Sequence, residues 1–288
     1  MKVCVIGANG QLGSDLCEIF RQDELFPLNH ADIEIRDESQ CYQVLESIRP
    51  DFVINTASYH NVPLCEERAQ EAMSVNILGA KNLACACDRL KTSLIHYSTD
   101  YVFDGLKSSP YIESDRPNPL NVYAITKLAG EHVVQSYCEN HKVLRVSGIY
   151  GKIPCRAKGT NFVATMLKLA RQKTELDVVN DEVLTPTHTL DIARQTRDLI
   201  VSPETGIFHV SNAGQCSWYE FAAYLFECLG MDIIVNPVSS DHFPSTVKRP
   251  KWSVLENARL KELSIYRMPH WKEALKAHLE RIATSNGI

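Results

Sequence analysis

The N-terminal segment MKVCVIGANGQLGSDL constrains the fold more than any other part of the chain. Its apolar run from Lys2 to Ile6 predicts a buried strand, and a helix is expected from about Gln11. Between them, Gly7 would make a tight turn, Gly10 would let the backbone approach a pyrophosphate, and Gly13 would let the helix pack closely on the strand. The spacing is one residue longer than the common G-x-G-x-x-G fingerprint. Because the strand starts the chain, we also expect no cleaved signal peptide.

The residues after the second predicted strand, Leu25 to Leu28, bear on the choice of cofactor. A typical NAD site places a carboxylate here for the adenosine ribose, whereas this chain has Asn29 and His30. Without an anion to repel a 2′-phosphate, and with Arg36 nearby, we expect NADP(H), with NAD(H) also usable. Arg36 can equally be a solvated loop charge. Asp37 opens the next helix, where it can serve as the N-cap or contact adenine.

Strand-like apolar runs alternate with helical patterns through the first half of the chain. The runs lie at Lys2 to Ile6, Leu25 to Leu28, Phe52 to Asn55, Leu94 to Ser98 and Lys142 to Ser147, and one long helix is expected from about Glu66 to Leu90. This alternation predicts an α/β fold, a Rossmann-like doubly wound parallel sheet covered by helices on both faces. After Gly151 the pattern becomes irregular and mixed. We expect a dinucleotide-binding Rossmann domain over residues 1–150. Residues 151–288 would form a smaller, mainly substrate-binding region, with some elements returning to the sheet and a substrate cleft between the two.

Composition excludes several other classes of protein. The 288 residues carry a net charge of -5, which gives no basic footprint for nucleic acid. No apolar run approaches the roughly 18 residues of a membrane span, so a cytoplasmic location is expected. The ten cysteines contain no C-x-x-C pair and no histidine cluster accompanies them. We interpret them as reduced, mostly buried thiols and predict no metal ion.

Tyr123 and Lys127 in the run YAITK are the strongest candidates for chemistry. Residues four apart lie on one face of a helix, about one turn from each other. An ordinary tyrosine titrates near a pKa of about 10, and a neighbouring ammonium would lower that pKa toward working pH. The spacing alone also fits a surface tyrosine beside a solvated lysine. The catalytic interpretation of this pair is supported by the STDYVF run before it and by the glycine loop.

Several motifs spread along the chain resemble one family. They are GANGQLG, NTASYHNV, HYSTDYVFDG, PLNVYAITKLAGE, GTNFVATML, TPTHTLDIA and GIFHVSNAGQCSWYEFA. Together they resemble the dTDP-4-dehydrorhamnose reductase family of extended short-chain dehydrogenases/reductases, over essentially the whole chain. The resemblance implies NADPH-dependent reduction of a nucleotide-linked 4-keto-6-deoxy sugar, in the simplest case dTDP-4-dehydrorhamnose to dTDP-rhamnose.

The glycine loop and the resemblance together assign roles to particular residues. Expected cofactor contacts are Gly7, Gly10, Gln11, Leu12, Gly13, Asn29, Asp37, Ala57, Ser58, Tyr59, Tyr97, Tyr123 and Lys127. The resemblance implies that Tyr123 protonates the carbonyl oxygen, Thr99 adds a hydrogen bond, and Lys127 holds the nicotinamide ribose. Thr99 and Asp100 would reach the substrate. Arg249, in an R-P segment, is either a contact for the nucleotide diphosphate or a surface loop cation.

Two positions depart from the family pattern. Where some members carry Trp in an S-W-x-Y segment, this chain has Gly148. Either the sugar pocket is wider, which we favour, or Ile149 and Tyr150 fill it. The acid needed for metal-linked dimer contacts in some members appears here only as Asp15, so both a monomer and a homodimer stay open.

Two other functions fit the same motifs. A non-catalytic regulatory subunit of the methionine adenosyltransferase beta type shares this fold and much of the motif set. A sugar-nucleotide epimerase or dehydratase would recycle a tightly bound NAD. Net oxidation of added NADPH would distinguish a reductase from both.

Overall fold

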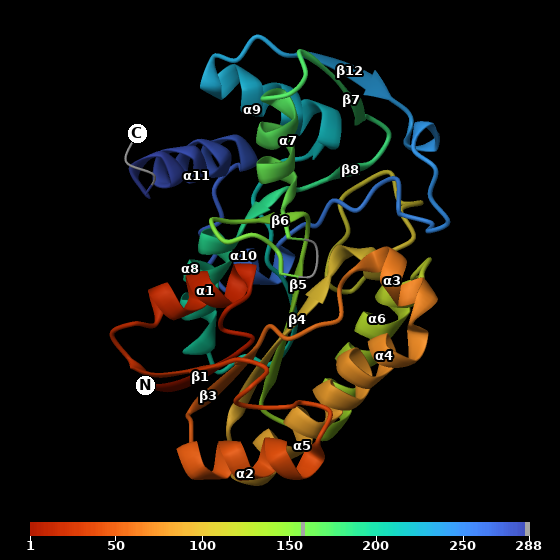
Figure 1. Cartoon of the computed structure of the whole chain (residues 1–288). Coiled ribbons are helices and arrows are strands. Elements are labelled where there is room, and N and C mark those ends of the chain that lie inside the picture. Colours follow the sequence, from red (N-terminus) through yellow and green to blue (C-terminus); the bar gives the residue numbers. More distant parts are fainter. Residues whose placement is uncertain (157–158, 286–288) are drawn as a thin grey trace.

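A six-stranded parallel sheet forms the centre of the computed structural model, which describes residues 1–156 and 159–285 (Figure 1). The strand order is β10-β5-β4-β3-β1-β2. These strands are β1 (Lys2–Ile6), β2 (Glu24–Leu28), β3 (Phe52–Asn55), β4 (Ser93–Thr99), β5 (His141–Val146) and β10 (Gly206–His209). The predicted α/β fold with a doubly wound parallel sheet is confirmed. The order reverses between β1 and β3, and ligands of such sheets bind at the strand ends beside this point.

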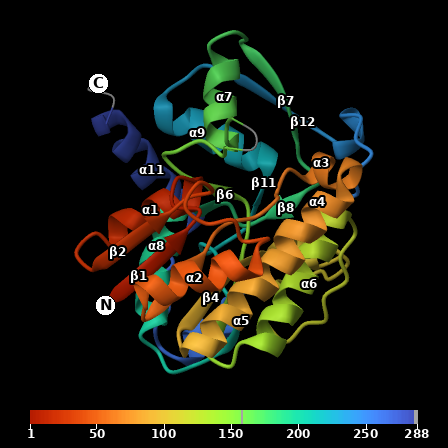
Figure 2. The same cartoon turned by 60° about the horizontal axis from the view of Figure 1, so that its bottom comes forward.

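Helices cover both faces of this sheet, as Figure 2 shows from a second direction. They are α1 (Gln11–Ile19), α2 (Glu38–Ile48), α3 (Val62–Glu67), α4 (Ala69–Met73), the π-helix η1 (Ser74–Gly79), α5 (Ala80–Leu90), the short 3-10 helix η2 (Asp100–Val102), α6 (Val122–Tyr137), α8 (Thr189–Ile200) and α10 (Ala258–Glu262). Apolar side chains of α1, α8 and α10 pack on one face of the sheet. Apolar side chains of α2, α5 and α6 pack on the opposite face, so helices bury both faces.

The helix expected from Glu66 to Leu90 is in fact divided into four pieces. The chain passes from α3 to α4, widens into the π-helix η1 and continues as α5. π-Helical turns are rare and frequently lie at functional sites. This one carries Asn76, a buried side chain that faces the strand ends.

The remaining elements form a region above the carboxyl ends of the sheet. They are β6 (Ile149–Tyr150), α7 (Phe162–Ala170), β7 (Glu175–Val179), β8 (Val183–Leu184), β9 (Thr187–His188), β11 (Cys216–Ser217), α9 (Trp218–Leu229), β12 (Ile234–Val238), the 3-10 helix η3 (Ser240–His242) and α11 (Trp271–Ser285). In Figure 1, α7, α9, β7 and β12 gather at the end of the molecule opposite α2 and α5. Their own apolar core is rich in aromatic rings, including Phe221 and Trp271. By contrast, β10 leaves this region and pairs with β5 in the central sheet.

Candidate active site

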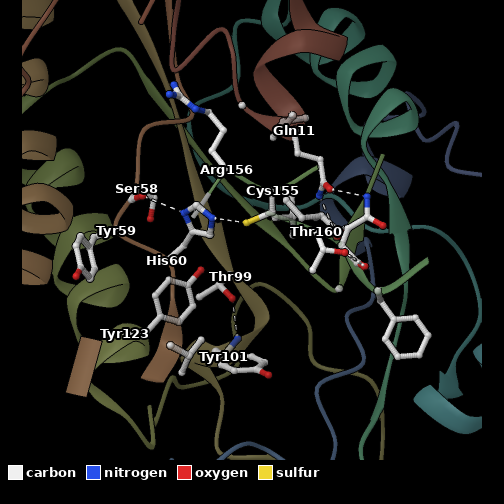
Figure 3. A pocket seen from close by; sticks show the side chains of 18 of the residues that line it. Gln11, Ser58, Tyr59, His60, Thr99, Tyr101, Tyr123, Cys155, Arg156 and Thr160 are labelled. Carbon is white, nitrogen blue, oxygen red and sulfur yellow. Dashed lines mark hydrogen bonds between the residues drawn. The ribbon is translucent and has the colours of Figure 1, made fainter. Parts of the chain in front are cut away.

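A cavity of about 1430 Å³ runs between the strand ends and the C-terminal region. It begins at the β1–α1 turn and the loop after β2, passes Tyr123 and Lys127, and ends among Leu176, Trp218 and Arg249. Pockets for one drug-sized ligand have volumes of about 300–1,000 Å³. This cavity therefore has room for two ligands, and Tyr123 is among the side chains that line it (Figure 3).

The glycine turn forms one end of the cavity through its backbone. Gly7 has φ of +80°, and a Cβ there would lie 2.5 Å from the Thr56 hydroxyl oxygen. A Cβ at Gly13 would lie 2.1 Å from the Gly7 carbonyl oxygen, so Gly13 serves the packing of α1 and does not line the cavity. Gly10 precedes α1 and offers no side chain to cap its first amides. Those amides and the positive end of α1 fit a phosphate group.

Gln11 at the start of α1 bonds through both ends of its side-chain amide to other parts of the protein. Its Nε2 donates to the Ile149 carbonyl at 3.1 Å, and its Oε1 accepts from the Asn161 amide at 3.0 Å. The side chain thus ties the cofactor end to the C-terminal region. The backbone of Gln11 and the second N–H of its side-chain amide are left for the expected phosphate contact, together with the backbone of Leu12, which also lines the cavity.

The loop after β2 differs from the expectation that no carboxylate lies there. Asn29 lines the cavity as predicted, but so does Glu34, whose carboxylate pairs with Arg36 at 2.6 Å. The Arg36 guanidinium lowers the pKa of Glu34 to about 2, so the acid is ionised. Asp37 does not line the cavity; it caps α2, accepting from the Gln40 amide at 3.0 Å. Of the two roles expected for Asp37, the structure shows the N-cap.

Asn76 of η1 holds the segment after β3 against the cavity, a role that no spacing in the sequence revealed. Its Oδ1 accepts from the Ser58 hydroxyl at 3.1 Å and from the Tyr59 amide at 2.9 Å. Its Nδ2 donates to the Tyr59 carbonyl and to the Thr126 hydroxyl, both at 2.9 Å. Ala57, Ser58 and Tyr59 all line the cavity. The π-helical turn therefore clamps this wall to α6.

Tyr97 and Asp100, at the end of β4, are both buried and both line the cavity. The Tyr97 hydroxyl bonds to the Thr196 hydroxyl at 2.6 Å. The Asp100 carboxylate accepts from the hydroxyls of Thr99 at 3.1 Å, Ser147 at 2.9 Å and Ser253 at 2.6 Å. Burial raises the pKa of Asp100 to about 6. Asp100 therefore joins β4 to two distant segments besides facing the cavity.

Tyr123 is carried by α6 and lines the cavity, with Thr99 beside it (Figure 3). Burial raises the pKa of this phenol, and the facing Thr99 hydroxyl partly offsets the rise. The pKa lowering that we expected from Lys127 is therefore wrong for the protein by itself. The reason is burial, which disfavours a phenolate more strongly than the neighbouring groups favour it.

Lys127 is 3% exposed, and its Nζ lies 3.4 Å from Nε2 of the buried His96. Asn55 accepts from the Ala57 amide with its Oδ1 and so presents its Nδ2 as a donor to His96 Nδ1, at 3.1 Å. A neutral His96 must then carry its proton on Nε2, facing Lys127. Burial lowers the pKa of Lys127 to about 8, opposed by Glu131. The amine can therefore exchange a proton near neutral pH.

The prediction of a wider pocket at Gly148 is wrong. Its φ is +48°, and a Cβ there would lie 2.5 Å from Leu184 Cδ1 and 3.5 Å from the Trp218 ring. Ile149 lines the cavity, but Tyr150 is fully buried in the C-terminal core. The space is filled instead by Leu184 and by Trp218, which stacks on Phe162 with ring centroids 4.5 Å apart. The apolar wall exists, but other elements supply it.

Three further residues of the cavity were not singled out from the sequence. His60 and Cys155 meet in its wall, and Glu182 lies near Arg249. Burial raises the pKa of Glu182, and the Arg249 guanidinium opposes that rise. Arg249 thus lies inside the cavity, where its charge is partly balanced by an acid of the same protein. No sequence pattern could reveal the His60–Cys155 and Glu182–Arg249 pairs, because the two residues of each pair are far apart in the chain and come together only in the folded protein.

The described residues contain no cluster of acidic, histidine or cysteine side chains able to hold a metal ion. No disulfide links any of the ten cysteines, all of which lie in the described part of the chain. Across the same residues, no helix has the length and apolar character needed to span a bilayer.

The doubly wound sheet, the glycine turn, and Tyr123 and Lys127 in one cavity define a nucleotide-dependent oxidoreductase. The family model described as RmlD substrate binding domain matches residues 1–284, and the chain belongs to this family. The spore coat polysaccharide biosynthesis protein SpsK of Bacillus subtilis is 37% identical over 281 residues, 97% of each chain.

Two solved structures are also similar over nearly their full lengths. A dTDP-4-dehydrorhamnose reductase from Clostridium acetobutylicum has a TM-score of 0.94 at 37% identity, covering 98% of this chain and 99% of that one. A dTDP-4-dehydrorhamnose reductase from Bacillus anthracis, in complex with NADP, has a TM-score of 0.93 at 36% identity, covering 98% and 100%.

Proposed function

We propose that this protein reduces the 4-keto group of a dTDP-linked 6-deoxy sugar with NADPH, in the simplest case dTDP-4-dehydrorhamnose to dTDP-rhamnose. One observation carries the proposal. Tyr123, Lys127 and Thr99 line a single cavity, which is also lined by a backbone cradle for phosphates and by apolar and cationic side chains. Full-length similarity to proteins named as reductases of this substrate, one of them in complex with NADP, supports it.

The residues present fit an NADP molecule at the glycine end of the cavity. The uncapped amides of α1 fit the pyrophosphate, and Asn29 and Arg36 lie where an adenosine ribose would be bound. Ala57, Ser58 and Tyr59 would line the molecule along the strand ends, with Tyr97 beside it. When bound, the reduced nicotinamide supplies the hydride. NAD(H) would be the second choice.

We assign proton donation to the Tyr123 phenol, which its raised pKa keeps protonated until a carbonyl oxygen that gains negative charge beside it takes the proton. The Thr99 hydroxyl, which donates to Asp100 in the protein by itself, would turn to donate a second hydrogen bond to the carbonyl oxygen as negative charge grows there. Lys127 would hold a ribose hydroxyl, and with its pKa of about 8 it can return a proton to Tyr123 after each turnover. Each role needs only atoms that already face the cavity.

The sugar nucleotide would occupy the other half of the cavity. Trp218, Phe162 and Leu184 form an apolar surface suited to the 6-methyl group and the base, and Arg249 is placed to bind the diphosphate. Asp100 and the Gly148 backbone border the same space. The internal bonds of Asp100 make it a positioning group for Thr99 as well as a boundary of the sugar site.

Asp15 does not favour a metal-linked dimer. It is 2% exposed, and its carboxylate already pairs with Arg281 at 2.8 Å and accepts from the Thr189 hydroxyl. We therefore propose that no metal ion bridges two subunits at Asp15. Both a monomer and a metal-free homodimer are compatible with these contacts. A cytoplasmic location and the absence of nucleic-acid binding stay predictions from composition.

The test is to follow NADPH absorbance while the protein is offered 4-keto-6-deoxy sugars linked to dTDP, UDP or GDP. We expect steady NADPH oxidation with the dTDP sugar and a product reduced at C4. Tyr123→Phe is the matched control for adventitious oxidation. Binding of NADPH with no turnover on any sugar would favour a regulatory subunit, and copurified NAD that is regenerated in each cycle would favour an epimerase.

A further inference from the structure

A histidine and a cysteine meet in the cavity wall beside the reaction centre. His60 follows β3, and Cys155 lies on the loop between β6 and α7. The His60 Nε2 and the Cys155 Sγ are 2.9 Å apart. Figure 3 shows the two side chains pointing toward one another, and Tyr123 lines the same cavity. Neither has a place in the reduction proposed above.

The proton positions on this pair follow from the bonding of the imidazole. His60 Nδ1 lies 3.0 Å from the Ser58 carbonyl oxygen, which can only accept. Nδ1 therefore carries a proton, and in the neutral ring Nε2 presents its lone pair to the thiol. The Cys155 S–H donates to Nε2. A thiol, a base and a group that orients the base are the three parts of an activated sulfur nucleophile.

Seven of the other cysteines lie in surroundings that suppress the thiolate. Burial raises the pKa of all seven: Cys4, Cys17, Cys41, Cys85, Cys87, Cys138 and Cys216. Cys65 is buried, with its Sγ toward the Tyr59 carbonyl. Cys228 is half-buried on α9 and packs at the edge of the C-terminal core, so it provides a matched control for exposure.

We propose that Cys155, activated by His60, is a covalent modification site for soft electrophiles and low-molecular-weight disulfides. In the disulfide reaction, the Cys155 proton passes to His60 and the thiolate attacks one sulfur of the disulfide. A new S–S bond forms as the old one breaks, and the released thiolate takes the proton from His60. The cysteine is oxidised and half of the disulfide is reduced to a thiol.

Modification would close the cavity, because an adduct on Cys155 must occupy space that a ligand needs. Cys155, Phe162 and Tyr123 line the same cavity, so a tripeptide such as glutathione would lie between the apolar wall and the phenol. The consequence for turnover rests on the proposed function. The reactivity of the thiol does not, and the two can be measured separately.

The first test is alkylation with limiting iodoacetamide at neutral pH, followed by peptide mass spectrometry. An ordinary thiol is only a few per cent thiolate at neutral pH, so we expect Cys155 in the folded protein to react about tenfold faster than in the urea-unfolded chain. Cys155→Ser should abolish the fast phase, and Cys228→Ser should leave it intact. Labelling of another cysteine first, or no acceleration over the unfolded chain, would overturn the proposal.

His60→Gln and His60→Phe test the activation itself. Both should slow labelling of Cys155 to the rate of an ordinary thiol, provided that thermal melting shows a folded protein. An unchanged rate in both would show that His60 does not activate the sulfur. The comparison of folded and unfolded wild-type protein stays decisive if neither variant folds.

The second test uses oxidised glutathione. Treated protein should carry one glutathione at Cys155 and lose NADPH oxidation, and dithiothreitol should restore both. For Cys155→Ser the ratio of treated to untreated activity should be close to one. A glutathione adduct at Cys155 on a fully active protein would overturn the inference that the adduct blocks the cavity. Fast labelling of a protein with no activity on any sugar would instead count against the proposed function alone.

Discussion

The two walls of the cavity are built in different ways. The cofactor wall is made by short continuous segments at consecutive strand ends, and much of it is backbone: the turn at Gly7, the start of α1 and the segment after β3. The sugar wall is made by side chains from several separate elements and loops, among them α7, β7, β8 and α9, with Trp218 and Leu184 filling space next to Gly148. The first is fixed by local sequence, whereas the second exists only after the C-terminal region has packed.

The junction of the two walls should show the largest effect. Tyr123→Phe keeps the ring and its edge contact with Tyr101 but removes the proton donor. We expect turnover to fall by about 10²–10⁴-fold, the usual contribution of general acid catalysis, with NADPH affinity retained. Stopped-flow turnover and fluorescence titration of NADPH measure the two quantities. A loss of only a few-fold would remove Tyr123 from the acid role.

Substitution of Lys127, on the cofactor wall, should have opposite effects on catalysis and on stability. Its pKa of about 8 lies below the usual 10.5. Below pH 8 Lys127 is charged in the folded protein, so burial of that charge lowers the free energy of unfolding by its full amount. Between about pH 8 and 10.5 the unfolded chain holds a proton that the folded protein has lost, and stability rises with pH. Lys127→Met should therefore weaken NADPH binding and turnover, yet unfold at higher denaturant at neutral pH.

The gain in stability of Lys127→Met, at most about 3 kcal/mol, should shrink as pH rises from 8 to 10.5. Urea unfolding at several pH values gives this difference directly, and Lys168→Met, at an exposed position of α7, is a control for the mere loss of a lysine. A destabilised Lys127→Met variant at neutral pH would mean that the ammonium is better compensated than its burial indicates.

The sugar wall can be broken at Gly148. Because φ is +48° and Leu184 lies 2.5 Å from the Cβ position, Gly148→Trp should destabilise the protein by about 1–3 kcal/mol and raise KM for the sugar. NADPH affinity should hardly change, because the cofactor wall is separate. Gly148→Ala should change stability and KM in the same direction but by less. A Gly148→Trp protein with unchanged melting and lower KM would restore the idea of a wider pocket.

The contrast between the walls also explains what could be predicted from the sequence. The parallel sheet and the strands at Lys2–Ile6 and Phe52–Asn55 follow from apolar periodicity and glycine spacing, which are local signals. The filling of the Gly148 space by Trp218 depends on contacts across 70 residues of chain, and the clamp formed by Asn76 depends on a π-helical turn with no spacing signature. The burial that sets the pKa of Tyr123 is likewise a property of the folded protein.

The smallest expected effect lies at the far end of the cofactor wall, in the choice between NADPH and NADH. The Glu34 carboxylate holds Arg36 at 2.6 Å and competes with a 2′-phosphate for it. Glu34→Gln should release the guanidinium and favour NADPH, whereas Asn29→Asp should add an anion to the same loop and favour NADH. Arg36 is 46% exposed, so each change is worth no more than about 1 kcal/mol, a factor of about five in the ratio of kcat/KM values.

Salt should reduce both shifts in cofactor preference, because exposed charges are screened. Arg36→Gln supplies the reference, since in its absence Glu34→Gln should have no further effect on the preference. If Glu34→Gln favours NADH instead, the carboxylate binds the ribose hydroxyls and acts as the acid of an NAD site. That result would mean that the cofactor wall, like the sugar wall, takes part of its specificity from a side chain that its local sequence did not reveal.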